Sequence, residues 1–111
     1  MSSINIIELG KDMLNAAGEV VSDNFDDIKL LADDELEGFA RRTIKLAKMV
    51  EAGDLSAEQA KAILKIRKNA LESVLLSISG IGILAAQEAI NSAIDVLRES
   101  VNKLIPGIDI L

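Results

Sequence analysis

Apolar residues recur every three or four positions along the first part of the chain, as they do on one face of an α-helix. The first series is Ile6, Leu9, Met13, Ala16 and Val20. This series predicts an amphipathic helix over about residues 4–22, with Ser2 or Ser3 as its N-terminal cap. The polar run at 22–27 has the composition of a turn.

A second apolar face predicts a helical hairpin. Its members are Ile28, Ala32, Leu36, Phe39, Thr43, Leu46 and Val50. The helix that carries them starts near Asp26 or, after a break, near Asp34, and we set it at about residues 34–52. Gly53 suits the left-handed position that ends a helix, and Ser56 with Gln59 forms a capping box that starts the next one. Helix, tight turn and helix together predict an αα-hairpin.

The second arm of the hairpin is predicted over about residues 57–105. Pro106 stops it, and an apolar tail follows at 106–111. Gly80 and Gly82 lie within this stretch and mark a kink, a break or a close helix crossing. Continuity and a break near 79–82 both remain open. The chain is therefore expected to be one all-α domain, a helical hairpin or bundle with an N-terminal amphipathic helix.

The end of this stretch has a coiled-coil-like seam beside a ridge of small residues. Spacings of three and four relate the large members, and spacings of four relate the alanines. Together they are the predicted self-association interface: Ala85, Ala89, Ile90, Ala93, Ile94, Leu97, Val101 and Leu104.

An uncharged window at 73–87 raises the alternative of a membrane-interacting protein that inserts residues 73–93. The window is about 22 Å long as a helix, against a hydrocarbon core of roughly 30 Å. No aromatic belt flanks it. A helix buried within a bundle explains the window better.

Composition argues against an enzyme and against a resident cofactor or metal. The chain has no Cys and no His, which removes thiol and imidazole chemistry and the common zinc ligands. Its 111 residues include only two aromatic side chains, too few for a sugar-binding cleft. The acidic runs at 26–27 and 33–37 do not match a calcium-binding loop.

Charge is divided along the chain. The net charge is −8 over residues 1–40, +5 over 41–68 and −3 over 69–111. Two rows with the same helical spacing form a predicted basic band: Arg41, Lys45, Lys48, and Lys61, Lys65, Lys68. The band lacks the aromatic residues and the module of a specific nucleic-acid site. Its expected partner is the acidic segment 19–37 of another copy, in head-to-tail contacts.

These features predict a non-enzymatic structural or assembly protein that forms a homo-oligomer or packs in a multi-copy complex, for example as a virion component. A membrane-interacting protein is the alternative. The third candidate is a small regulatory adaptor with an exposed apolar groove. The first residues lack the basic and apolar regions of a secretory signal, so the expected location is the cytoplasm or a particle assembled there.

Overall fold

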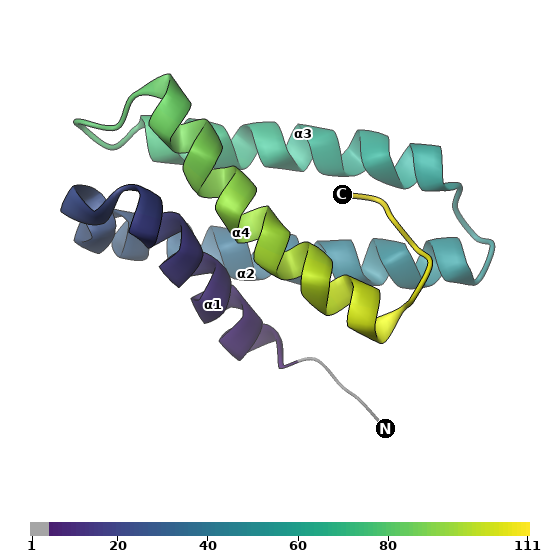
Figure 1. The fold of residues 1–111 in the computed structure, drawn as a ribbon. Helices are drawn as coiled ribbons and strands as arrows, with labels where there is room; N and C mark the ends of the chain where they lie inside the picture. Colours follow the sequence, from purple (N-terminus) through teal and green to yellow (C-terminus); the bar gives the residue numbers. More distant parts are fainter. Residues whose placement is uncertain (1–4) are drawn as a thin grey trace.

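A computed structural model describes residues 5–111, in which four α-helices form a bundle without strands. The elements are α1 (Ile6–Val20), the 3₁₀ turn η1 (Ser22–Asn24), α2 (Phe25–Glu51), α3 (Ala57–Leu76) and α4 (Ile83–Leu104). Helices α2 and α3 form an antiparallel hairpin, which α4 crosses obliquely with α1 beside it (Figure 1). The all-α bundle expected from the sequence is confirmed.

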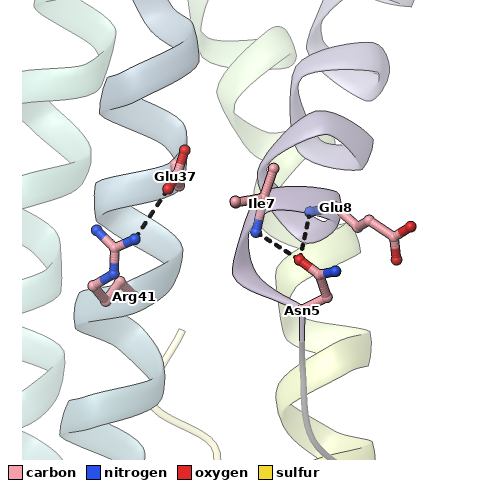
Figure 2. A network of polar contacts seen from close by, with 5 residues as sticks. All are labelled: Asn5, Ile7, Glu8, Glu37 and Arg41. Atoms are coloured by element: carbon pink, nitrogen blue, oxygen red, sulfur yellow. Dashed lines mark hydrogen bonds and ion pairs between the residues drawn. The ribbon is translucent and has the colours of Figure 1, made fainter.

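Helix α1 begins at a side-chain cap. The Asn5 Oδ1 atom accepts hydrogen bonds from the backbone N–H groups of Ile7 and Glu8, at 3.1 and 3.2 Å (Figure 2). These two donors have no partner inside the helix, so the cap satisfies them. Ser2 and Ser3, the caps predicted from the sequence, lie outside the described residues.

The hairpin turn has the predicted local chemistry. Ser56 Oγ accepts from the Gln59 backbone N–H, and Gln59 Oε1 accepts from the Ser56 N–H, each at 3.0 Å. Gly53 adopts a φ of 82°, the left-handed region that a side chain disfavours. Helix α2 begins at Phe25, so the earlier of the two predicted starts holds and the boundary at 34 is wrong.

The stretch set at 57–105 is not one helix, because a loop at 77–82 separates α3 from α4. Helix α3 ends at Leu76, and Gly80 within the loop has a φ of 93°, a left-handed conformation that a regular helix does not contain. Ile78 and Ile81 are buried, so the loop closes one end of the core. Asn24 Nδ2 donates to the Ser79 carbonyl at 3.2 Å and joins this loop to η1. The break near 79–82, rather than continuity, is the alternative that the chain adopts.

The core runs the length of the bundle between all four helices. Its largest fully buried side chains are Met13, Ile28, Leu36, Leu75, Ile90, Leu97 and Thr43. Thr43 is the one buried polar side chain in residues 5–111, and its hydroxyl donates to the Phe39 carbonyl at 2.9 Å. Since that hydroxyl is satisfied, the core carries no unpaired polar group in this part of the chain.

Candidate docking groove

Helices α3 and α4 diverge from their connecting loop (Figure 1). Side chains of both helices line a groove between them. The groove encloses about 500 Å³. Its floor is apolar and consists of Phe39, Leu64, Ile94, Ile110 and Leu111. A volume of this size lies within the roughly 300–1,000 Å³ of ordinary ligand sites. The groove is therefore large enough to accept a few aliphatic side chains or a small molecule.

Basic side chains line the groove, three of them on its α3 rim and one on its α4 rim. Helix α3 contributes Lys61, Lys65 and Lys68, and helix α4 contributes Arg98 together with Asn91 and Asp95. Arg98 pairs with Asp95 at 2.7 Å, whereas none of the three lysines forms an ion pair with a residue in 5–111. The rims thus carry an excess of positive charge that a ligand can neutralise.

Only one of the two predicted basic rows lies at this groove. Lys61, Lys65 and Lys68 line it, while Arg41, Lys45 and Lys48 are exposed elsewhere on α2. Arg41 pairs instead with Glu37 on its own helix, at 3.0 Å (Figure 2). The equal spacing of the two rows therefore does not give them equal surroundings.

Sequence reasoning missed the α4 side of the groove. Asn91, Asp95 and Arg98 follow a spacing of four and three, but they carry mixed charge and form no basic run. Each lies one position away from the apolar seam at Ile90, Ile94 and Leu97. That adjacency places them on the edge of the buried face, and this is the signal by which they could have been found.

The predicted self-association seam lies inside the bundle. The six members Ala89, Ile90, Ala93, Ile94, Leu97 and Val101 are buried, and Ala85 and Leu104 pack against the core. Among the other elements, α1 packs most extensively against α4. An interface between copies through this seam would require the bundle to open.

The glycines predicted to mark a kink or close crossing lie in the loop at 77–82. Gly80 is in the left-handed region described above, and Gly82 directly precedes α4. Neighbouring Leu76, Ile83 and Leu84 are exposed. No helix in the described residues is long and apolar enough to cross a bilayer.

The C-terminal tail forms one end of the groove. After the Pro106–Gly107 turn the chain runs back, and its last residues lie between α3 and α4 (Figure 1). Ile110 is 2% exposed, although residues 109–111 make no hydrogen bond with the described bundle. Apolar contacts alone therefore hold the end of the tail in the groove.

The remaining chemistry is sparse. A second, smaller cavity of about 190 Å³ lies between α2 and α3, with Glu35, Arg42 and Arg67 at its edge. Within residues 5–111, no three carboxylates are grouped as a metal ion would require. No family model, curated protein or solved structure matches the chain. The α3–α4 groove is thus the strongest candidate for a functional site.

Proposed function

We propose that this chain is a non-enzymatic assembly module whose α3–α4 groove binds an acidic, apolar-faced segment of a partner protein. One observation carries this function: along the α3 side of an apolar floor lie three lysines that form no ion pair with a residue in 5–111. Burial of aliphatic side chains on such a floor supplies affinity. The cationic α3 rim selects for carboxylates and against basic partners.

The C-terminal tail supports a protein segment as the occupant. It presents an acid followed by two aliphatic residues, Asp109, Ile110 and Leu111. Its two aliphatic side chains already line the groove. The floor is thus able to pack side chains of this kind from a short peptide segment, and a partner segment would extend the same contacts along α3.

Nucleic acid is a poorer occupant of this groove. Single strands bind through exposed aromatic rings that stack on bases, together with a positive surface. Phe39, the aromatic residue of the groove, is only 4% exposed and forms part of the floor. The chain also has a net charge of −6, which repels phosphate at a distance.

Fluorescence anisotropy with a labelled amphipathic peptide, in which glutamates flank a leucine stripe, tests this function. We expect the peptide to bind and its counterpart with lysines in place of the glutamates not to bind. Replacing Lys65 and Lys68 by Glu should weaken binding about tenfold or more, because like charges then face each other across the groove. Added salt should weaken binding by the wild-type protein, since Lys61 and Lys65 on the rim are exposed.

The matched control is the double change Lys45→Glu and Lys48→Glu. It alters the net charge by the same amount on the exposed row of α2 and should leave the affinity unchanged. Equal losses in the two double variants would contradict a groove site and indicate a general charge effect. Binding of dodecanoate in the groove without binding of the peptide would indicate that the ligand is a small anionic amphiphile and not a protein.

A further inference from the structure

Near its start, helix α2 presents two leucines to solvent. Leu30 is 83% exposed and Leu31 is 46% exposed, far more than the other leucines of this helix. Asp27 and Asp34 are exposed and lie three or four positions from both leucines, so the four side chains are neighbours on the helix surface. We call these four residues the α2 face. None of their side chains forms a hydrogen bond or ion pair with a residue in 5–111.

We infer that the α2 face of one copy docks into the α3–α4 groove of a second copy, an assignment that rests on the groove function proposed above. Leu30 and Leu31 then lie on the apolar floor, beside the tail residues that already occupy it. The carboxylates of Asp27 and Asp34 meet the α3 rim. Each surface thus combines apolar groups with charged ones, and the charges of the α2 face are opposite in sign to those of the α3 rim.

The spacing of the charges matches across the two surfaces. Asp27 and Asp34 are seven residues apart, and so are Lys61 and Lys68. At 1.5 Å per helical residue, each pair spans about 10 Å along its own helix. Two helices placed side by side can therefore bring both carboxylates to lysines at the same time.

Charge around the two surfaces also favours their encounter. Four cations and one carboxylate line the groove. Around the α2 face, the exposed residues Asp23, Asp26 and Glu35 add negative charge, against the single base Lys29. Complementary fields of this kind accelerate association and orient the partners.

The geometry implies a head-to-tail assembly. The α2 face and the groove are different surfaces, so each copy keeps one free surface after the first contact. Contacts of this kind build rings where the rotation closes and open rows where it does not. A two-fold dimer would arise only if both face–groove contacts formed at once between the same two copies.

Sedimentation velocity of the full chain tests the assignment with two variants, each of which disrupts one of the two surfaces. The groove variant carries Lys65→Glu and Lys68→Glu, and the face variant carries Leu30→Ser and Leu31→Ser. We expect the wild-type protein to associate, less so in high salt, and each variant alone to be a monomer. Mixed together, they should form a one-to-one dimer and nothing larger, because only one intact pair of surfaces remains.

The control for the face variant is Ile7→Ser with Ile66→Ser, which removes two exposed isoleucines outside both surfaces and should leave association unchanged. Circular dichroism checks that every variant keeps its helices. Wild-type association without a dimer in the mixture would overturn the assignment in favour of another interface.

The labelled peptide separates this failure from that of the groove function. A wild-type monomer that still binds the peptide would exclude a second copy as the partner while leaving the groove function in place. A wild-type monomer that does not bind the peptide would overturn both.

Discussion

Helix α4 has one sealed flank and one open flank. On the sealed flank, Ala86, Ala89 and Ala93 have no exposed surface, and α1 is the helix that packs most extensively against α4. On the open flank, toward α3, the side chains of Asn91 and Arg98 line a groove of about 500 Å³. The same 22-residue helix thus closes the core on one side and leaves a docking surface on the other.

This difference assigns stability and binding to opposite flanks of one helix. Burial of apolar surface on the sealed flank contributes to the free energy of unfolding. Charges on the open flank are exposed and contribute little to that free energy. Substitutions on the two flanks should therefore have separable effects, which the following predictions test.

The largest effect is expected for Leu97→Ala. Leu97 has no exposed surface, so its truncation removes transfer free energy and leaves a cavity. We expect the free energy of unfolding in urea to fall by about 2–5 kcal/mol. Peptide affinity, measured under conditions where the variant is folded, should be unchanged. A destabilisation below about 1 kcal/mol would show that the bundle refills this space.

A smaller loss of stability is expected when a larger side chain is placed on the sealed flank. Ala93→Leu adds three carbons at a fully buried position, where neither α1 nor α4 can accommodate them without moving. Overpacking of this kind costs about 1–3 kcal/mol. The midpoint of urea unfolding should fall with an unchanged slope. An increase in stability would mean that α1 and α4 are not in close contact at Ala93.

Local features of the fold could be predicted from the sequence because they depend on neighbouring residues. The capping box at Ser56 and Gln59 and the left-handed Gly53 are set by chemistry within a few positions. The apolar periodicity of α4 likewise identified most of its buried residues, whereas only Leu9 and Met13 of the series predicted for α1 are buried. It did not identify what buries them, and the seam expected between copies packs within the chain.

The groove could not be predicted because it depends on the angle between two helices. That angle follows from the loop at 77–82, whose path depends on contacts such as Asn24 with the Ser79 carbonyl, 55 positions apart. The α3 lysines were visible as a basic row, yet the row on α2 looked equivalent to it. Only the position of α4, with Arg98, distinguishes the two rows.

The loop between α3 and α4 supplies a third test, with a paired control. Gly80→Ala places a side chain in the left-handed region, which costs about 1 kcal/mol. Gly38→Ala, in the interior of α2 with nothing within 4 Å of its added carbon, should stabilise by about 1 kcal/mol through helix propensity. Thermal unfolding should therefore shift in opposite directions. A shift in the same direction would contradict the loop geometry.

The smallest effect on stability is expected for Asn91→Phe, on the open flank. Asn91 is exposed and lines the groove, so a larger side chain there displaces solvent rather than core and should change the free energy of unfolding by less than about 0.5 kcal/mol. The added ring occupies space that the peptide needs, so its binding should be lost. Asn69→Phe, an exposed asparagine of α3 outside the groove lining, should leave binding intact. If the two variants bound the peptide equally well, the open flank of α4 would not be the docking surface.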